Sequence, residues 1–402
     1  MKKFSTVYLV LLLISFGISA QTKPYVLLVS FDGFRWDYLN RGITPNMEKI
    51  RQEGASALSF KPSFPSKTFP NHQTIITGMY PAHHGIIANN FLDPFTKRLY
   101  LMKDSNEVND SRWYIGEPFW ETAEKQGITC ASYFWPGSEL RSAERRATYF
   151  QHYNHTEPAE NRIDGVIKWL QLPQEKRPHF INLYFSDTDS YGHEYGPTSS
   201  ETNEAIKHLD GVAGQILKRL EEIKMKDSVN VIFLSDHGMT DVSKDRVVNI
   251  EKMLMDYKCK FLDEGVLMAI DAPKDKQQEI YNFLKKNQNH FNVYYREEIP
   301  RYFHFSDNPY IPKIVLIPEL GWNLVTNRGE NRMDGKGGNH GYDNQQIDMH
   351  GIFLATGPSF KNGYRTGTIW NIDVYPLLCK IFNVIPRANI DGDLDRIEFI
   401  LK

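Results

Sequence analysis

The sequence of 402 residues lacks several features that would by themselves define a protein class. It has only three cysteines, Cys130, Cys259 and Cys379, too few and too scattered for a disulfide framework and without a Cys-x-x-Cys pair for a structural metal. It has no charge excess, since 47 basic residues face 49 acidic ones, so neither binding to a nucleic-acid duplex nor a basic membrane-binding surface is indicated. Internal repeats and Pro/Gly/Ser-rich linkers are also missing. We therefore expect one large globular domain over residues 21–402.

The first twenty residues differ from the rest of the chain. Lys2 and Lys3 precede an apolar stretch at residues 7–16, and small residues follow at positions 17–20. This pattern is typical of a secretory signal peptide, and the stretch is too short for the ~30 Å hydrocarbon core of a bilayer. We expect residues 1–20 to be removed, which gives a secreted, periplasmic protein with no stable membrane span; an uncleaved anchor is the alternative. The sequence does not indicate the oligomeric state.

Three continuous apolar runs predict strands that are buried on both faces, at residues 25–31, 180–185 and 229–234. Patterns typical of helices lie between them at residues 45–54, 118–126 and 201–222. Strands that alternate with helices predict an α/β fold with a mostly parallel central sheet and helices on both faces. Residues from about 256 to 331 are patterned less regularly, and we expect them to decorate one edge of the sheet.

Carboxylates follow all three predicted strands. Asp32 follows the first strand, Asp187 and Asp189 follow the second, and Asp236 follows the third. One such aspartate is ordinarily a turn former or a helix cap. Three of them at one edge of a sheet, where α/β proteins bind ligands, would repel one another unless a cation compensated their charge.

Histidines accompany two of these carboxylates. His193 lies four residues after Asp189, and His237 directly follows Asp236. Mixed nitrogen and oxygen ligands suit zinc and related cations. His340 and His350 come later in the chain, and either one can complete such a site.

Thr68 is the candidate nucleophile. It lies between a proline-punctuated loop at residues 62–66 and a helix-like run at residues 73–78. A threonine at such a position ordinarily caps the helix. A hydroxyl that is bound to a metal, however, loses its proton near neutral pH and needs no histidine base. The residues alone leave both roles open.

Seven motifs, taken together, resemble the nucleotide pyrophosphatase/phosphodiesterase family of the alkaline phosphatase superfamily, in its free-standing bacterial form. The motifs are Phe31-Asp-Gly-Phe-Arg35, Lys67-Thr-Phe-Pro-Asn-His72, His84-Gly-Ile-Ile-Ala-Asn89, Phe134-Trp-Pro-Gly-Ser138, Asp189-Ser-Tyr-Gly-His193, Ser235-Asp-His-Gly-Met239 and Asn339-His-Gly-Tyr-Asp-Asn344. They occur in the family's order, and the resemblance runs from Tyr25 to about Pro386. It implies an alkaline-phosphatase-like fold and a phosphoric diester hydrolase.

The resemblance also implies two Zn²⁺ ions per chain and a role for each matching residue. It puts one zinc on Asp189, His193 and His340, and the other on Asp32, Thr68, Asp236 and His237. It makes Thr68 the nucleophile and Asn89 the amide that binds a phosphate oxygen. Ala88 departs from the family, which often has aspartate there. The motif around His340 matches the family ligand, so His350 is expected to pack under the site.

The expected reaction is hydrolysis of nucleotide phosphodiester and phosphoanhydride bonds to nucleoside 5′-monophosphates. It proceeds by two in-line displacements through a phosphothreonine on Thr68. Two zinc ions balance three carboxylates and the threonine alkoxide, so the site is about neutral and suits a phosphodiester with one negative charge.

The resemblance also implies three aromatic substrate contacts. Phe69, next to Thr68, and Tyr153 would stack on the base, with Tyr149 as the alternative second ring, and Tyr184 would lie near the nucleoside. Stacking is worth about 1–3 kcal/mol per base, which favours nucleotides over aliphatic alcohols.

Three other functions stay open. The same dinuclear site can serve a choline or glycerol phospholipid phosphodiesterase. It can also serve a phosphomonoesterase, for which a dianionic substrate would want an extra cation near Asn89; Lys67 is the candidate for that cation. The third is a metal or nucleotide binder without turnover, which would have no use for a metal-held hydroxyl on Thr68.

Overall fold

The computed structural model describes residues 23–330 and 336–402. The predicted signal peptide at residues 1–20 lies outside these ranges. Among the helices within them, none combines the length and the apolar character that crossing a membrane requires.

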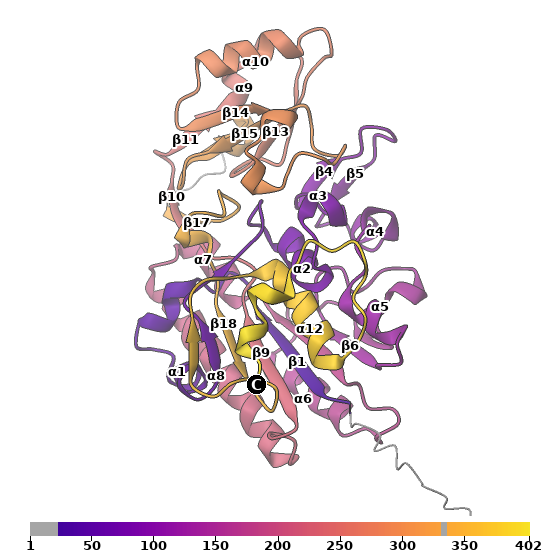
Figure 1. Ribbon diagram of the computed structural model, residues 1–402. Coiled ribbons are helices and arrows are strands. Elements are labelled where there is room, and N and C mark those ends of the chain that lie inside the picture. The colour runs from indigo at the N-terminus through magenta and orange to yellow at the C-terminus, as the bar shows by residue number, and fades with distance from the viewer. Residues whose placement is uncertain (1–22, 331–335) are drawn as a thin grey trace, which may run out of the picture.

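An eight-stranded sheet lies at the centre of the molecule, with the order β19-β2-β18-β9-β1-β8-β6-β7 (Figure 1). Its strands are β1 (Tyr25–Phe31), β2 (Ala55–Ala57), β6 (Cys130–Tyr133), β7 (Tyr149–Gln151), β8 (Phe180–Phe185), β9 (Val229–Leu234), β18 (Phe353–Thr356) and β19 (Tyr364–Thr366). β1 is parallel to both of its neighbours, β8 and β9. β18 is antiparallel to β9 and β2. The prediction of a mostly parallel sheet is confirmed, and the three predicted strands have the predicted bounds.

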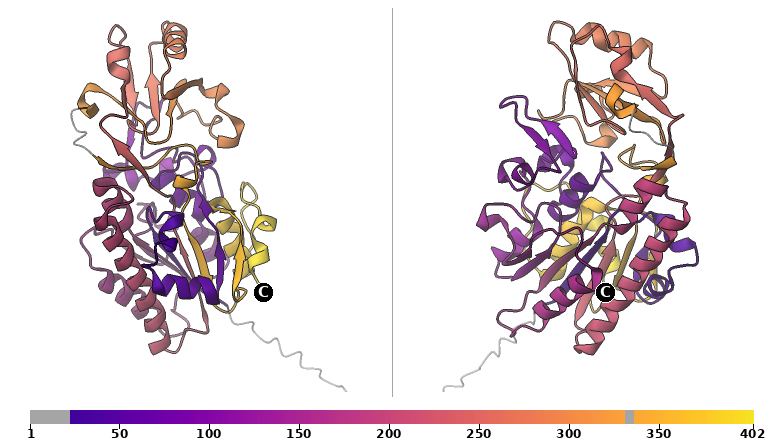
Figure 2. Two further views of the ribbon diagram at one scale, coloured as in Figure 1. Left: turned by 90° about the vertical axis from the view of Figure 1, so that its left-hand side faces the viewer. Right: turned by 180° about the vertical axis from the view of Figure 1, so that it is seen from behind.

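Helices cover both faces of this sheet, as the sequence predicts (Figure 2). α1 (Pro45–Glu53), α6 (Ala159–Leu170) and α8 (Ser200–Glu222) pack on one face, and α2 (Thr68–Thr77), α5 (Phe119–Glu124) and α12 (Val374–Phe382) pack on the other. The side chains of β1 alternate between the two cores: Leu27 and Val29 enter the first, Val26 and Leu28 the second. Burial on both faces explains why this strand is apolar throughout.

The region around residues 256–331 is more regular than the sequence predicts. β12 (Lys260–Leu262), β13 (Met268–Asp271), β14 (Phe291–Tyr295) and β15 (Ile314–Pro318) form an antiparallel sheet with the order β12-β13-β15-β14. Together with α9 (Ile250–Met253) and α10 (Gln277–Lys286) it encloses a core of its own. We call this unit the small sheet; it stands at the top of Figure 1.

Shorter elements complete the fold. Four two-stranded ladders join β4 (Asn90–Leu92) to β5 (Leu99–Leu101), β10 (Thr240–Ser243) to β17 (Lys336–Asn339), β11 (Val247–Asn249) to β16 (Asn323–Val325), and β3 (Phe60–Lys61) to β20 (Ile369–Trp370). The remaining α-helices are α3 (Pro81–His84), α4 (Ser105–Val108), α7 (Asp187–Tyr195) and α11 (Asn327–Glu330). Among the ladder strands, β17 positions a candidate metal ligand, because it ends directly before His340.

Candidate functional site

The candidate site lies at the carboxyl ends of three neighbouring strands. Asp32 directly follows β1, Asp189 lies in the first turn of α7 after β8, and Asp236 and His237 follow β9. Because β1 lies between β8 and β9 and is parallel to both, these side chains meet at one edge of the sheet. Asp32 and Asp236 are each 1% exposed, whereas the Asp189 side chain is 18% exposed, so two of the three carboxylates are shielded from bulk water.

Asp189, His193 and His340 form the first group of possible metal ligands. Asp189 Oδ1 lies 3.3 Å from the Nε2 atoms of both His193 and His340, and the two Nε2 atoms are 3.1 Å apart. Asp189 and His193 are one helical turn apart on α7, whereas His340 arrives from the end of β17. The structure thus brings together residues that are 151 positions apart in the sequence.

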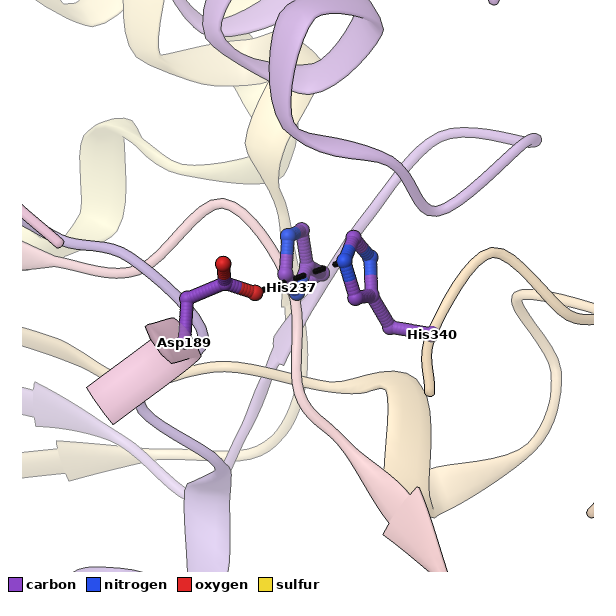
Figure 3. A group of neighbouring side chains, drawn as sticks. All are labelled: Asp189, His237 and His340. Carbon is purple, nitrogen blue, oxygen red and sulfur yellow. Dashed lines mark ion pairs between the residues drawn. The ribbon is translucent and has the colours of Figure 1, made fainter. Parts of the chain in front are cut away.

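Asp32, Asp236, His237 and Thr68 form the second group. His237 Nε2 lies 3.2 Å from Asp32 Oδ1, 3.1 Å from Asp236 Oδ2 and 3.3 Å from Thr68 Oγ1. The two groups adjoin, because the rings of His237 and His340 stack with their centroids 3.5 Å apart (Figure 3). The seven residues that the resemblance assigns to two zinc ions therefore lie in one continuous cluster.

The three histidines of the cluster share one orientation. Nδ1 of His193 lies 2.9 Å from Gly338 O, Nδ1 of His237 lies 2.8 Å from Gly238 O, and Nδ1 of His340 lies 2.9 Å from Ser66 O. A carbonyl oxygen can only accept, so Nδ1 donates in each case and Nε2 faces the carboxylates. Metal-binding histidines are held in this way by a backbone carbonyl on the other ring nitrogen.

Three carboxylate oxygens in the cluster are buried without a hydrogen-bond partner: Asp32 Oδ1, Asp189 Oδ1 and Asp236 Oδ2. An unpaired buried carboxylate oxygen is costly. Two sets of mixed carboxylate and imidazole ligands, Asp189/His237/His340 and Asp32/Asp236/His237, lie close enough to hold a cation. Divalent cations with a preference for nitrogen and oxygen, such as zinc, fit these residues.

The electrostatics of the cluster lead to the same conclusion. Burial raises the pKa of Asp189 to about 6, and burial together with the neighbouring Asp32 raises the pKa of Asp236. Burial acts the same way on Asp32, but His237 outweighs it and lowers the Asp32 pKa to about 2. Burial opposes protonation of His237, and yet Asp236 and Asp32 hold its pKa well above 6.5. In the absence of a metal, a proton on His237 compensates part of the charge of the three carboxylates; two divalent cations would compensate all of it.

Thr68 is the first residue of α2, and Lys67 rather than Thr68 occupies the N-cap position. The threonine hydroxyl is therefore free to face His237. The backbone oxygen of Thr68 lies 2.9 Å from Nδ1 of His72, whose Nε2 lies 2.9 Å from Ser30 Oγ on β1. Sequence reasoning missed this role of His72, because the predicted helix-like run at residues 73–78 begins after both residues, whereas α2 begins at Thr68 and places them one turn apart.

Asn89 and Gly33 border the cluster on two sides. Asn89 Oδ1 accepts a hydrogen bond from the backbone N–H of Phe69 at 3.3 Å, which places the side-chain amide beside the first turn of α2. Gly33 has a φ of +67°, and a Cβ atom there would lie 2.9 Å from Asp189 Cα. The glycine thus allows α7 to approach β1; in the sequence it stands out only as part of the Phe31–Arg35 motif.

His350 and Lys67 lie beside the cluster with partners of their own. His350 is bonded on both ring nitrogens, to Ser59 Oγ at 2.9 Å and to Asn344 O at 3.1 Å. Lys67 Nζ lies 2.5 Å from Asp263 Oδ2 in an ion pair with the small sheet.

The aromatic residues divide into two kinds of environment. Tyr184 is 7% exposed, and its hydroxyl donates to Asp32 Oδ2 at 2.5 Å, so it contacts a candidate metal ligand. Tyr153 is 47% exposed and its ring centroid lies 6.2 Å from that of Tyr184. Tyr149 instead donates to Lys176 O and packs near Trp169. Of the two tyrosines considered for stacking, Tyr153 is the one beside the cluster.

Comparisons with known proteins agree with this geometry. The family model described as "Type I phosphodiesterase / nucleotide pyrophosphatase" matches residues 26–343. The chain is 36% identical to human ectonucleotide pyrophosphatase/phosphodiesterase family member 1 over 94% of its length, but spans only 42% of that protein. It is also 36% identical to human bis(5′-adenosyl)-triphosphatase ENPP4, covering 92% of this chain and 81% of the relative.

A solved structure shows that the likeness extends to the fold. Murine ectonucleotide pyrophosphatase/phosphodiesterase 5, in an inactive threonine-to-alanine form in complex with AMP, superposes with a TM-score of 0.89 at 32% identity. The match covers 94% of this chain and 100% of the murine chain. The fold predicted from the sequence is confirmed.

Proposed function

The chain belongs to the type I phosphodiesterase/nucleotide pyrophosphatase family, whose members are hydrolases of phosphodiester bonds, and we propose that it is a zinc-dependent nucleotide phosphodiesterase. Its products are nucleoside 5′-monophosphates, released from phosphodiester and phosphoanhydride substrates. The relatives named ectonucleotide pyrophosphatases also support a site of action outside the cytoplasm, which the predicted signal peptide would provide.

The observation that carries the proposal is the set of three unpartnered buried carboxylate oxygens faced by three Nε2 atoms. We assign one cation to Asp189, His193 and His340 and the other to Asp32, Thr68, Asp236 and His237. When bound, two divalent cations would stabilise negative charge on the attacking and leaving oxygens of a phosphoryl transfer. The ligand chemistry favours zinc.

The residues of the chain then have distinct tasks. Thr68 Oγ1 attacks phosphorus, the bond to the leaving oxygen breaks, and a phosphothreonine forms; water then attacks the same phosphorus and releases Thr68. His72 holds the first turn of α2, and with it Thr68, through the Thr68 carbonyl. Asn89, beside that turn, is placed to donate its amide N–H to a phosphate oxygen.

The substrate class is supported by two features. Phe69 follows the nucleophile and Tyr153 is half exposed beside the cluster, so that a base can stack near both. Among the similar proteins, one is named for the hydrolysis of a dinucleoside triphosphate and another holds AMP. An inactive threonine-to-alanine form of the latter agrees with a threonine that is needed for turnover.

Replacement of the nucleophile tests the proposal. Thr68→Ala should lower turnover of p-nitrophenyl-TMP by on the order of 10³-fold or more, because it removes the covalent step. Thr77→Ala is the matched control, since Thr77 ends the same helix and its hydroxyl donates to Gln73 O and accepts from the backbone N–H of Met79, neither of which is a candidate ligand. Both variants should retain zinc, measured by elemental analysis. Near-native turnover of Thr68→Ala would rule the mechanism out.

A further inference from the structure

We propose that Asp263 makes the site prefer phosphodiesters over phosphomonoesters by neutralising Lys67, the residue before the nucleophile. The inference rests on the proposed function and adds a specificity-determining pair to it. Neither residue belongs to the cluster of seven candidate metal ligands. Both come from elements that meet only in the folded protein, α2 and the small sheet.

Lys67 and Asp263 form a short, buried ion pair. Lys67 Nζ lies 2.5 Å from Asp263 Oδ2, and the two side chains are only 7% and 6% exposed. Charges that are so well shielded from water are not screened as surface pairs are. Asp263 directly follows β12 and adopts a φ of +59°, in the left-handed region that residues other than glycine rarely adopt. The small sheet thus holds this carboxylate at the ammonium group.

The pair lies on the flank of the candidate site. The stem of Lys67 runs over Gly341, the residue after His340: a Cβ atom on Gly341 would lie 3.0 Å from Lys67 Cε. Asp263 lines one small cavity together with Ala88 and Asn90, the two neighbours of Asn89. The ion pair therefore adjoins the residue after a candidate metal ligand on one side and the two neighbours of Asn89 on the other.

The charge of the substrate determines how strongly the Lys67 ammonium group would attract it. At neutral pH a phosphodiester carries one negative charge, whereas a phosphomonoester, with a second pKa near 6, carries nearly two. A free ammonium group at this position would attract the dianion more strongly than the monoanion. Paired with Asp263, Lys67 adds no net charge. The net charge of the site therefore stays near zero, which suits a monoanionic substrate.

A series of variants that changes this charge in single steps tests the proposal. Asp263→Asn adds one positive charge relative to wild type, Lys67→Gln removes one, and the double variant Lys67→Met/Asp263→Leu leaves the net charge unchanged. The values of kcat/KM for p-nitrophenyl phosphate and p-nitrophenyl-TMP are measured for all four proteins, with zinc content and thermal midpoint recorded for each. The quantity of interest is the ratio of monoester to diester kcat/KM.

We expect the ratio to follow the charge. It should rise roughly tenfold or more in Asp263→Asn, fall in Lys67→Gln, and stay within about threefold of wild type in the double variant. If Asp263→Asn does not fold, Lys67→Gln and the double variant still differ by the one charge of Asp263 and should differ in ratio in the same direction.

A purely structural link between α2 and the small sheet gives a different result. All variants would then lose both activities in parallel, with the ratio constant across the series, and this outcome overturns the proposal. A ratio in the double variant as high as in Asp263→Asn would overturn it as well. Absence of diesterase activity in the wild-type protein would contradict the proposed function instead, so the two failures are distinguishable.

Discussion

Tyr184 fixes one oxygen of Asp32 and leaves the other one directed at the cluster. Its hydroxyl donates to Oδ2 at 2.5 Å, whereas Oδ1 is buried without a hydrogen-bond partner and lies 3.2 Å from His237 Nε2. A carboxylate held in this way cannot rotate freely. Partners that orient a ligand from behind contribute strongly to metal affinity, which gives this tyrosine a role that its position in the sequence does not reveal.

Tyr184→Phe should therefore weaken zinc binding by about 10- to 100-fold, because Asp32 loses the donor that orients it. The affinity is measured by competition with a chromogenic chelator. Tyr100→Phe is the control: its hydroxyl is also buried but pairs with Tyr114. Equal zinc affinities in wild type and Tyr184→Phe would contradict this role.

Gly33 and Gly42 form a natural matched pair for testing how closely the ligand-bearing elements must approach. Their φ values are +67° and +71°, so a side chain at either position costs backbone strain. A Cβ atom at Gly33 would lie 2.9 Å from Asp189 Cα, whereas a Cβ atom at Gly42 has nothing within 4 Å. We expect both alanine variants to lose about 1 kcal/mol of stability from backbone strain, and Gly33→Ala to lose more because of the contact with Asp189. Only Gly33→Ala should also lose turnover, by tenfold or more, because α7 must shift.

The two readouts separate strain from displacement. Urea unfolding reports the free energy of unfolding of each variant, and kcat/KM for p-nitrophenyl-TMP reports the geometry of the site. Comparable losses of turnover in both variants would show that the positive φ, and not the contact with Asp189, is what matters.

At the scale of elements, the central strands could be predicted because burial on both faces requires a continuous run of apolar residues, which is visible in the local sequence. β1 sends alternate side chains into two cores, so every position from Val26 to Val29 is apolar. The site could be predicted in outline because Asp32, Asp189 and Asp236 follow such strands and ligands bind at their carboxyl ends. Thr68 from α2 and His340 after β17 were added to the predicted site by the family resemblance, since nothing in the local sequence relates them to these strands.

The small sheet could not be predicted in the same way. Its strands are short and half exposed, as in Phe291–Tyr295, and they pair across long stretches of chain: Ala269 lies opposite Val315. Such pairing depends on tertiary contacts and not on local propensity. The same holds for the partner of Lys67, because Asp263 lies 196 residues further along the chain.

The helix α3 carries a contact whose strength depends on pH. His83 Nδ1 lies 2.7 Å from Asp391 Oδ2, and Nε2 lies 3.5 Å from Asp307 Oδ2. The hydrogen bond to Asp391 raises the pKa of His83 above its ordinary value of 6.5. A raised histidine pKa stabilises the fold fully below pH 6.5, and this stabilisation is lost as the pH rises through the pKa of the folded state.

We therefore expect the thermal midpoint of the wild-type protein to fall as the pH is raised above 6.5, by more than that of His83→Gln. The measurement is a series of thermal scans from pH 6 to pH 9, with zinc held constant. Because His83 is partly exposed, the difference should shrink in high salt. Parallel curves for the two proteins would show that the Asp391 contact contributes nothing to the pH dependence.

At the scale of the whole molecule, folding gathers like charges that are far apart in the unfolded chain. Asp32, Asp189 and Asp236 follow three neighbouring strands and meet at one edge of the sheet, with Asp32 and Asp236 almost fully buried. Burial raises the pKa of Asp189 to about 6 and raises that of Asp236. For Asp189 and Asp236 the central sheet thus assembles a site at a cost in stability, and a cation that binds only the folded state would offset that cost.

Removal of metal should accordingly destabilise the entire molecule and not only the site. A ligand present at 100 times its Kd adds about 2.7 kcal/mol to the free energy of unfolding, so we expect a chelator to lower the thermal midpoint by at least a few degrees.

In the double variant Asp189→Asn/Asp236→Asn the repulsion is gone together with the ligands. Its midpoint should lie above that of chelated wild type and should not respond to zinc. Two outcomes would contradict this account: equal unfolding temperatures for chelated and zinc-loaded wild type, or a double variant less stable than the chelated protein. Either would show that the carboxylates are not held together against their own repulsion. There would then be no reason to place cations between them.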